Sequence, residues 1–426
     1  MIGDEAWGEK HGSGVLAASL TVAGGDPIAP ARKLWNKVSA AVMDEPRLSR
    51  RTLARLGVLL AGSPLLARST SAAAPPANGQ AVDPAAPQPF SFERLIERTQ
   101  QLAKQPHQPP REVPAWLAQL PLDQHRQIRF KKDQAVWADS PSYQIQLFFP
   151  GAVYRTPVRV NTVDAGQARP VPLLPDMLDL GSVQLGGPLP ADLGFAGLRV
   201  HYPLHQPGVF DELLMFRGGS YFRAVGRGTR YGASARGLTL NTGLGRPEEF
   251  PMFRELWVQR PSQPFDPLTI YALLDSPSVA GAYRFDVVAR EHTQVDVNAN
   301  LFFRADVEQV GLASLASMFF FGPNDRQGVD DFRSAVHDSG GLLIWTGKGD
   351  VLWRPLVNPT GLRLSVFADE NPRGFGLAQR TRSFDSYEDL EARYDIRPNL
   401  WVEPRGTWGK GSVRLIEIPT PGEMHD

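Results

Sequence analysis

The residues Tyr143-Gln144-Ile145-Gln146-Leu147 place an apolar side chain at every second position, and this alternation decides the fold class. The pattern recurs at 158–161 (VRVN), 295–298 (VDVN) and 413–418 (VRLIEI). Proline and glycine interrupt it at short intervals, as expected for turns between short strands. Strands with one apolar face and one solvent-exposed face form antiparallel sheets that pack in pairs. The sequence therefore predicts an all-β protein, a large antiparallel β-sandwich.

Short helices are expected before the strands begin. Apolar residues recur at helical spacing from Phe92 to Leu102, Ser91 is a suitable N-cap, and Pro106 would stop the helix. A second short helix is expected at 116–120. The stretch 75–89, rich in proline, alanine and glutamine, has no periodic apolar pattern and is predicted to be a disordered linker.

The N-terminal part carries the features of an export signal. Arg50 and Arg51 precede a short apolar run, Leu56–Ala67, which is too short to span a bilayer. Small residues follow, so we predict a twin-arginine signal that is cleaved after Ala74. The residues before Arg47 are unusual for such a signal, and Met43 is an alternative start of translation. We assign 1–74 to an upstream extension and signal peptide.

Composition limits the kinds of partner. Lysine plus arginine and aspartate plus glutamate number 45 each, so no net charge favours nucleic acid or an anionic membrane. A neutral polymer is compatible with this balance. The chain has no cysteine, so a protein exported to an oxidising compartment would depend on core packing rather than on disulfides.

Glycine-rich blocks fill the second half of the chain from Leu193 onward. They read LGFAGLRV, SYFRAVGRGTRYGASARGL, EEFPMF, LLDSPSVAGAYRF, MFFFGPN, HDSGGL, NPRGFGLAQR and WGKGSVRLIEIPT. In order and spacing, residues 90–426 resemble the osmoregulated periplasmic glucan biosynthesis proteins of the G and D type. The twin-arginine signal is closer to the D type.

The resemblance implies a fold, a compartment and a substrate. It implies a sandwich of the galactose-mutarotase type over 90–426, located in the periplasm and acting on β-1,2-linked glucan. It also implies a following immunoglobulin-like domain. The given sequence stops at Asp426, about where the connection between the two domains would begin, and does not include that domain. The membrane glucan synthase is a further implied partner, and a homodimer is one alternative for the oligomeric state.

Three motifs suggest other chemistry but fit it poorly. Residues 226–232 (GRGTRYG) lack the Lys-Ser/Thr of a phosphate loop and favour a glycine-rich hairpin. His201 and His205 have metal-like spacing, but Pro203 disfavours the helix that would align them. Solvated turns are expected at Asp325, Asp330 and Asp331, which lack the closing glutamate of a calcium loop. We therefore predict no metal and no cofactor.

Aromatic and polar residues near the C-terminus suit a carbohydrate. Indole rings stack on pyranose faces, although a tryptophan is more often a packing residue. The candidate glucan-binding residues combine flat rings with fixed hydrogen-bond donors; they are Arg393, Tyr394, Trp401, Trp408 and Lys410. We expect at least one of the last three to face the glucan.

Cleavage of a glycosidic bond with inversion needs a carboxylic acid and a second carboxylate that activates water. The sequence has many acidic residues, so spacing cannot select the pair. Asp338 lies in the block HDSGG, where two glycines allow close approach of a ligand. The resemblance places the family's general base on Asp338 and its general acid on Asp426.

Three functions follow from the resemblance. The first is an inverting endo-β-1,2-glucanase, a glycoside hydrolase. The second is a transglycosylase or cyclising enzyme, in which a sugar hydroxyl replaces water as the acceptor. The third is a non-catalytic glucan-binding protein that assists the synthase.

Overall fold

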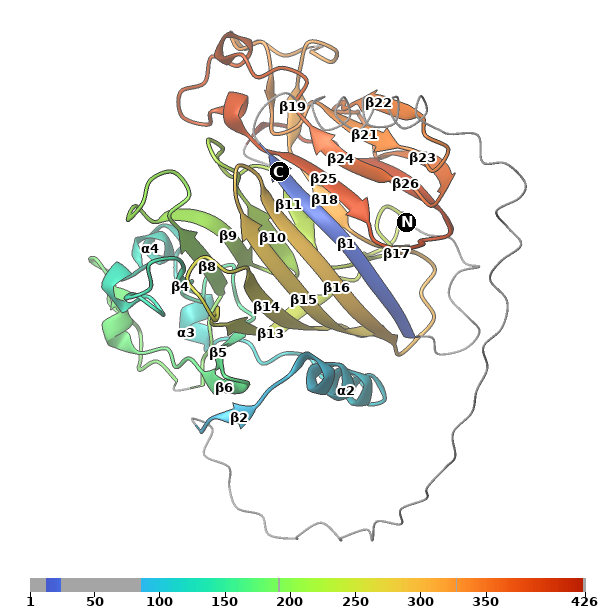
Figure 1. The fold of residues 1–426 in the computed structure, drawn as a ribbon. Helices are drawn as coiled ribbons and strands as arrows, with labels where there is room; N and C mark the ends of the chain where they lie inside the picture. The colour runs from blue at the N-terminus through green and yellow to red at the C-terminus, as the bar shows by residue number, and fades with distance from the viewer. Residues whose placement is uncertain (1–12, 24–85, 191, 327, 424–426) are drawn as a thin grey trace, which may run out of the picture. The chain divides into compact units, whose positions relative to one another are not determined.

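The computed structural model describes residues 13–23, 86–190, 192–326 and 328–423 (Figure 1). Within these ranges the chain is mostly β-strand, and the strands form two large sheets and four strand pairs. This confirms the predicted all-β sandwich. The predicted export signal with Arg50 and Arg51, most of the predicted linker and Asp426 lie outside the described residues.

The larger sheet has 12 strands, all antiparallel to their neighbours except β5 and β13, which run parallel. In spatial order it consists of β2 (Gln88–Pro89), β6 (Gln167–Pro170), β5 (Arg159–Asp164), β13 (Met252–Gln259), β14 (Leu268–Asp275), β15 (Val279–Ala289), β16 (Thr293–Phe303), β1 (Ser13–Ala23), β25 (Asn399–Pro404), β24 (Gly374–Ala378), β21 (Gly341–Trp345) and β22 (Val351–Pro355).

The smaller sheet has six strands: β18 (Ser314–Ala316), β11 (Ser234–Arg236), β10 (Tyr221–Ala224), β9 (Asp211–Arg217), β8 (Gly197–Tyr202) and β4 (Gln144–Leu147). The remaining strands form the pairs β12 (Thr239–Leu240) with β17 (Val310–Gly311), β19 (Phe319–Phe321) with β20 (Val336–His337), β23 (Arg363–Glu370) with β26 (Lys410–Glu417), and β3 (Arg129–Phe130) with β7 (Leu178–Asp179). All four alternating stretches of the sequence contribute to strands, namely β4, β5, β16 and β26.

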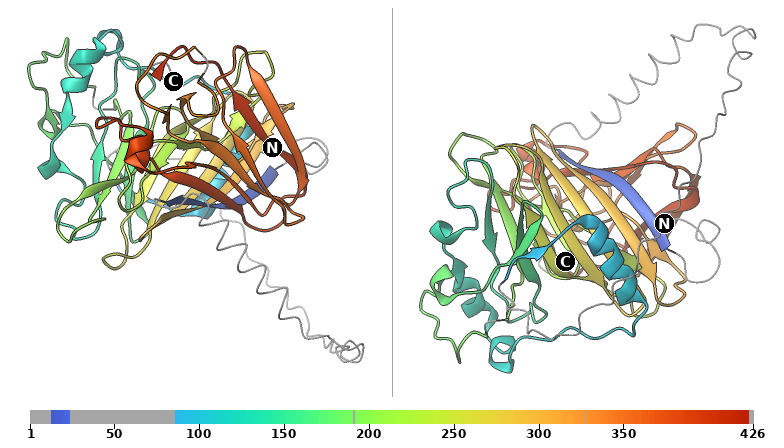
Figure 2. Two further views of the ribbon diagram at one scale, coloured as in Figure 1. Left: turned by 90° about the horizontal axis from the view of Figure 1, so that it is seen from above. Right: turned by 60° about the horizontal axis from the view of Figure 1, so that its bottom comes forward.

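The main core lies between the two sheets. Phe285 of β15 makes edge-to-face contacts with Phe216 of β9 and Phe222 of β10, at centroid distances of 5.1 and 5.3 Å. Such contacts stabilise beyond the area that the rings bury. Figure 2 shows the large sheet against the strands of the smaller one. This core holds the two sheets together, and the loops at one end of the sandwich project from them.

Helix α2 (Phe92–Ala103) covers the outer face of the large sheet (Figure 2, right). Ser91 accepts a hydrogen bond from the backbone N–H of Arg94, so the predicted N-cap is confirmed. Leu95 packs with Trp257 and Tyr271 of the sheet. The other helical turns are short: α3 (Ala115–Ala118), α4 (Leu122–Gln127), and the 3₁₀ turns η1 (Lys132–Gln134), η2 (Pro175–Met177), η3 (Phe384–Ser386) and η4 (Tyr394–Ile396). No described helix is both long and apolar enough to cross a bilayer.

Strand β1 comes from the segment that the sequence assigned to an upstream extension. It lies in the interior of the large sheet, antiparallel to β16 on one side and to β25 on the other. The side chains of Ala18, Leu20 and Val22 face the main core and are nearly fully buried. Part of the predicted extension is therefore a structural element of the sandwich.

Candidate active site

Asp338 follows β20 directly and is held by two other parts of the chain. Its backbone N–H donates to the carbonyl of Met318 at 2.9 Å. Its Oδ1 lies 3.3 Å from Nε of Arg397, and 14% of its side chain is exposed. The ion pair orients the carboxylate, and the remaining exposure leaves it accessible to solvent.

The loop 226–232 packs against this ion pair. It connects β10 with β11, which confirms the glycine-rich hairpin predicted from the sequence. A Cβ atom at Gly232 would lie 3.3 Å from Cγ of Asp338 and 3.1 Å from Cδ of Arg397, closer than most side chains tolerate. Arg397 also donates to the carbonyl of Tyr231. The glycine therefore lets the hairpin close over Asp338.

Gln379 joins the Asp338 segment to the loop that carries Tyr394. Its side chain is fully buried, and its Nε2 donates to the carbonyls of His337 and Tyr394, at 3.0 and 3.1 Å. Its Oε1 accepts from the hydroxyl of Tyr387 at 2.9 Å. A buried amide with its hydrogen bonds satisfied on both sides fixes the two segments relative to each other.

Tyr394 connects Asp338 with the end of the described chain. Its hydroxyl donates to Oε1 of Glu423, and its ring lies under the guanidinium of Arg397 at 5.3 Å. Burial, the hydrogen bond to Glu423 and the negative charge of Asp338 all raise the pKa of Tyr394. The phenol stays protonated at neutral pH and remains a donor to Glu423.

Arg333 holds three carboxylates around this end of the chain. Its guanidinium lies 2.8 Å from Asp331, 2.6 Å from Asp389 and 3.0 Å from Glu423. The hydrogen bonds to these carboxylates raise the pKa of Arg333, and Arg333 in turn lowers the pKa of Asp331. Glu423 is therefore tied to both Arg333 and Tyr394.

His337 fills the space beside Asp338 as a neutral ring. It stacks on Phe319 at 5.2 Å and meets the edge of Tyr387 at 5.4 Å. Burial lowers the pKa of His337 to about 4, and burial also lowers the pKa of His201 on β8 to about 4. Both rings are uncharged at neutral pH, so neither is a cationic group in the site.

The two buried histidines predict that stability depends on pH. Their folded pKa values lie below the usual 6.5, so the stability they contribute is complete above pH 6.5 and is lost as the pH falls towards 4. Each contributes as much as about 3 kcal/mol to the free energy of unfolding. Urea titrations at pH 7 and pH 4.5 should show this loss of stability. In His337→Phe, which keeps an aromatic ring at this position, the decrease in the free energy of unfolding between the two pH values should be about half of that in the parent. An equal drop in this variant would contradict the assignment to His337.

Two of the candidate glucan-binding residues are packing residues. Trp401 in β25 is 6% exposed, and its ring lies over Gly374, where a Cβ would come within 2.3 Å of it. Trp408 is 8% exposed, belongs to the main core and donates from Nε1 to the carbonyl of Ala17. The rings are covered by protein, so in this arrangement they present little surface to a pyranose.

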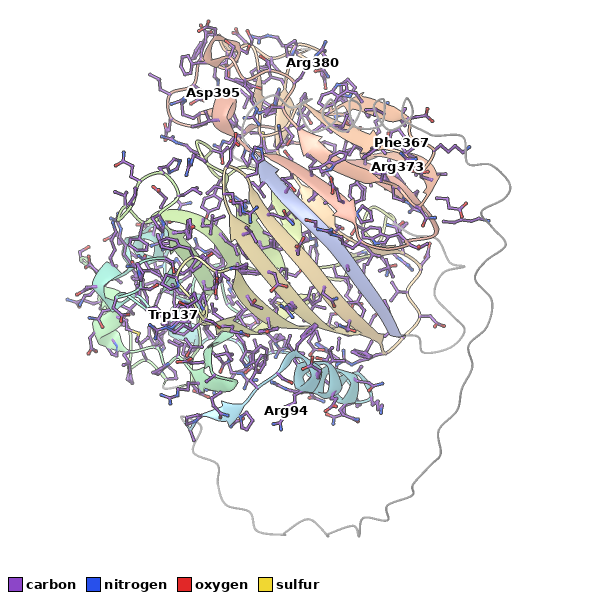
Figure 3. All side chains as sticks on the ribbon, viewed as in Figure 1. Arg94, Trp137, Phe367, Arg373, Arg380 and Asp395 are labelled. Atoms are coloured by element: carbon purple, nitrogen blue, oxygen red, sulfur yellow. The ribbon has the colours of Figure 1, made fainter. Side chains whose placement is uncertain are left out.

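The other candidates are placed differently. Lys410 begins β26 and is exposed. Arg393 has a left-handed backbone (φ 50°) and pairs with Asp395 through two hydrogen bonds, at 2.9 and 2.8 Å, which lower the pKa of Asp395. Figure 3 labels Asp395 at the end of the sandwich that carries β19. The structure therefore brings Asp338, Arg393 and Tyr394 to one end.

The motifs that suggested metals have other partners. His205 bonds to Asp211 through Nδ1 at 2.9 Å and accepts at Nε2 from the backbone of Gly228. Asp325 accepts from the backbone N–H of Asn358, and Asp331 pairs with Arg333. Among the described residues, no group of three or more His, Cys, Asp or Glu is arranged to hold a metal ion.

A hollow of about 460 Å³ lies beside this region, between β18 and β26. Its lining includes Ser317, whose hydroxyl bonds to Ser339 at 2.8 Å, but Asp338 is not among its lining residues. Volume alone does not mark a catalytic site, so we place the candidate site at the ion pair of Asp338 and not at the hollow.

Comparison with known families gives a match over 90–426, to the model described as "Periplasmic glucan biosynthesis protein, MdoG". The chain belongs to the MdoG family. The match includes every strand from β3 onward and all of the residues placed around Asp338.

Similar curated proteins carry the name "Glucans biosynthesis protein G". The protein of Vibrio cholerae serotype O1 is 48% identical over 339 residues, which are 79% of this chain and 62% of that protein. The protein of Shewanella frigidimarina is 49% identical over 340 residues, 79% of this chain and 61% of that protein. That of Rhodopseudomonas palustris (strain CGA009) is 49% identical over 328 residues, which are 76% of this chain and 65% of that protein. The chain spans about three fifths of the length of the first two of these relatives.

Several residues of the candidate site carried no functional signal in the sequence. Arg397, Gln379 and Arg333 act through hydrogen bonds to distant segments, which spacing does not reveal. The sequence did contain one indirect sign: Gln379 follows an apolar strand within the block NPRGFGLAQR. A polar residue at such a position often reaches a buried partner.

Proposed function

We propose that this chain carries the catalytic sandwich of a β-1,2-glucan-processing enzyme, with Asp338 as general base and Asp426 as general acid. The observation that supports it best is the meeting of two segments at Tyr394. Arg397 pairs with Asp338 and lies over the ring of Tyr394, whose hydroxyl donates to Glu423. Glu423 precedes Asp426 by three positions in the sequence, which supports the assignment of Asp426 to the same site.

The proposed reaction is hydrolysis with inversion. Asp338 accepts a proton from the attacking water, directly or through a substrate hydroxyl, while the water oxygen bonds to the anomeric carbon. Asp426 gives its proton to the glycosidic oxygen as that bond breaks. Arg397 keeps Asp338 in one orientation, and Arg393 and Tyr394 are the candidate contacts to the sugar on this side. Lys410 remains a proposed contact on the basis of its exposure alone.

Product analysis with purified protein tests the proposal. Linear β-1,2-glucan should be shortened to linear oligosaccharides of inverted configuration, whereas β-1,3 and β-1,4 glucans should remain intact. Successive rings of a 1,2-linked chain turn at angles that a groove built for another linkage does not follow. Cyclic products would instead support the transglycosylase, and unchanged glucan with measurable binding would support a glucan-binding protein that assists the synthase. Equal affinity for cello-oligosaccharides in calorimetry would refute the linkage preference.

We further propose a periplasmic location and export by the twin-arginine route, as for the D type. The family description supports the location, and the position of Arg50 and Arg51 ahead of the apolar run supports the route. Changing both arginines to lysine should leave the precursor in the cytoplasm, since this route reads the arginine pair. Cell fractionation measures the result, and unchanged periplasmic accumulation would refute the assignment.

The proposed partners are the β-1,2-glucan itself and the membrane glucan synthase. The balance of charges argues against nucleic acid as a partner. A homodimer remains a proposal that gel filtration with light scattering can test.

A further inference from the structure

Strand β1 is inserted into the sheet and is not appended to its edge. Its backbone pairs with β16 from Ser13 opposite Phe302 to Val22 opposite Thr293. On the other side it pairs with β25 from Ala18 opposite Pro404 to Ala23 opposite Asn399. Residues 24–87 separate it from β2, the next strand among the described residues. The strand is therefore bonded on both edges by segments that are distant in the sequence.

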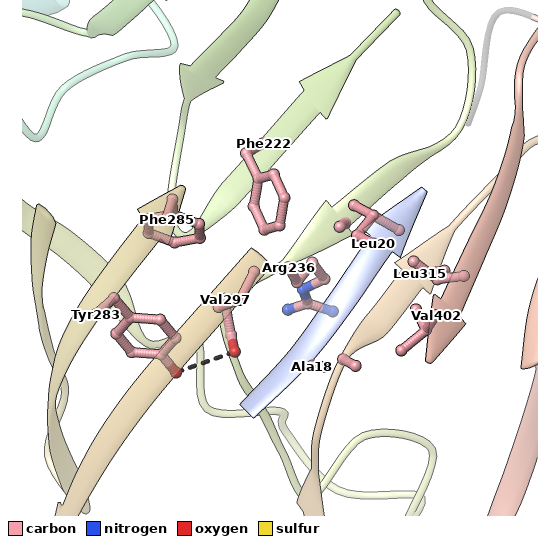
Figure 4. A pocket seen from close by; sticks show the side chains of 12 residues that line it. Ala18, Leu20, Phe222, Arg236, Tyr283, Phe285, Val297, Leu315 and Val402 are labelled. Atoms are coloured by element: carbon pink, nitrogen blue, oxygen red, sulfur yellow. Dashed lines mark hydrogen bonds between the residues drawn. The ribbon is translucent and has the colours of Figure 1, made fainter. Parts of the chain in front are cut away.

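The side chains of β1 match the two surfaces that they meet. On the inner face, Ala18 and Leu20 lie with Val402 of β25 around a cavity of about 30 Å³ (Figure 4). On the outer face, Ser19 hydrogen-bonds to Asp296 of β16. The carbonyl of Ala17 accepts from the backbone of Arg405 and from the indole of Trp408. Apolar side chains therefore meet the core, and the polar Ser19 meets the outer face.

Without β1, the two neighbouring strands could not pair with each other. Strands in a sheet lie about 4.8 Å apart, so β16 and β25 stand about 9.6 Å apart, twice the distance that backbone hydrogen bonds allow. Both would then expose a row of unpaired N–H and C=O groups, which is a template for another strand. We call this gap, bounded by β16 (Thr293–Phe303) and β25 (Asn399–Pro404), the strand slot.

One end of the strand slot reaches the hairpin of the candidate active site. A Cβ atom at Gly226 would come within 2.9 Å of the carbonyl oxygen of Val22. Gly226 begins the loop 226–232, and Gly232 at the other end of this loop packs on Asp338. The occupant of the slot therefore supports the loop that closes over the proposed base.

We propose that the strand slot is a binding site for an extended segment with apolar residues at alternate positions, that Ser13–Ala23 is its occupant, and that this segment stays bound when the connection to β2 is cut. The binding mode is addition of a strand to backbone edges, with side-chain alternation as the source of specificity. The inference does not rest on the proposed enzyme activity.

The test uses the full chain with a specific protease site inserted between Gly79 and Gln80. After cutting, the N-terminal fragment should co-elute with the remainder in gel filtration. A labelled synthetic peptide of residues 13–23, added in excess, should displace it in a saturable manner. Departure of the fragment on cutting, with no change in the melting temperature of the remainder and no peptide binding, would overturn the proposal.

Two adjacent alanines provide a matched control. Ala18 is 6% exposed and faces the core, whereas Ala17 is only partly buried. The peptide with Ala18→Lys should bind at least about 100-fold more weakly, because a buried, unpaired ammonium is strongly disfavoured. The peptide with Ala17→Lys should stay within about threefold of the parent. Ala18→Val should bind about threefold more tightly by filling the cavity.

Equal affinity of the two lysine peptides would show that the side chains of the strand do not determine binding, and it would contradict the proposed specificity. A second copy of the chain could also supply the strand. If differently tagged full chains exchange into mixed dimers that Ala18→Lys abolishes, the occupant comes from a partner copy, and the intrachain assignment is wrong.

Discussion

Replacing Asp338 or Asp426 with asparagine is expected to lower the rate of β-1,2-glucan cleavage by about two to four orders of magnitude. Asparagine keeps the size of the side chain but can neither accept the proton from water nor supply one to the leaving oxygen. Glucan affinity should stay near the parent value, because both amides still form hydrogen bonds. The double variant should lose less than the product of the two effects, since acid and base serve one transition state.

Asp330→Asn is the matched control for this pair. Asp330 is exposed in the loop that precedes β20, so the same chemical change there should leave the rate unchanged. Initial rates on linear β-1,2-glucan measure all four variants, and circular dichroism verifies the fold. If either catalytic variant keeps more than a tenth of the parent rate, that residue is not the proposed acid or base.

Arg333→Met is expected to have the second largest effect, although Arg333 is a positioning residue. The change leaves Asp331, Asp389 and Glu423 close together without their shared cation. The Arg333 side chain is only 15% exposed, so we expect a loss of about 3 kcal/mol in the free energy of unfolding. Because Glu423 then loses one of its two anchors, the turnover number should fall about 10- to 100-fold while the Michaelis constant changes little.

The control for Arg333 is Arg363→Met. The Arg363 side chain is 53% exposed and lies 3.8 Å from its partner Glu417, so its removal should cost no more than about 1 kcal/mol. Arg333→Lys keeps the charge but not the fork of donors, and it should recover stability better than turnover. If Arg333→Met and Arg363→Met lower the turnover number equally, Arg333 does not position the site.

Much of the fold could be predicted because its signals are local. Helix α2 was predicted from the spacing between Phe92 and Leu102 and from the N-cap Ser91, and the structure has it at Phe92–Ala103. Strands β4, β5, β16 and β26 follow the alternation of their own residues. The hairpin at 226–232 was predicted from its glycines.

The position of β1 could not be predicted in this way. Its partners lie far along the chain, and no turn next to it reveals which strands it joins. The indoles show a related limit: glycines and tryptophans in the C-terminal part of the sequence suggested backbone and rings that contact a sugar. Gly374 and Gly341 instead lie within strands, under the rings of Trp401 and Trp353. A glycine that lets a ring lie flat on a sheet has the same sequence signature as one that lets a ligand approach.

The candidate site was predicted only in part. Sequence alone could not choose Asp338 among many carboxylates, and the choice came from the resemblance. The three-dimensional contacts that surround it, from Arg397 to Gln379, join segments of different strands and have no common period or spacing. Asp426 lies outside the described residues, so its role as general acid stays a prediction.

The insertion of β1 also has a consequence in time. Leu20 is among the first residues to be synthesised, but its partner Val402 follows about 380 residues later. At roughly 5–20 residues per second, β1 waits roughly 20–80 s before its second edge exists. Its first partner, β16, is complete only at Phe303, and contacts between such distant segments form slowly. The large sheet is therefore completed late in biosynthesis, and a chain that is degraded or captured within that first minute never acquires it.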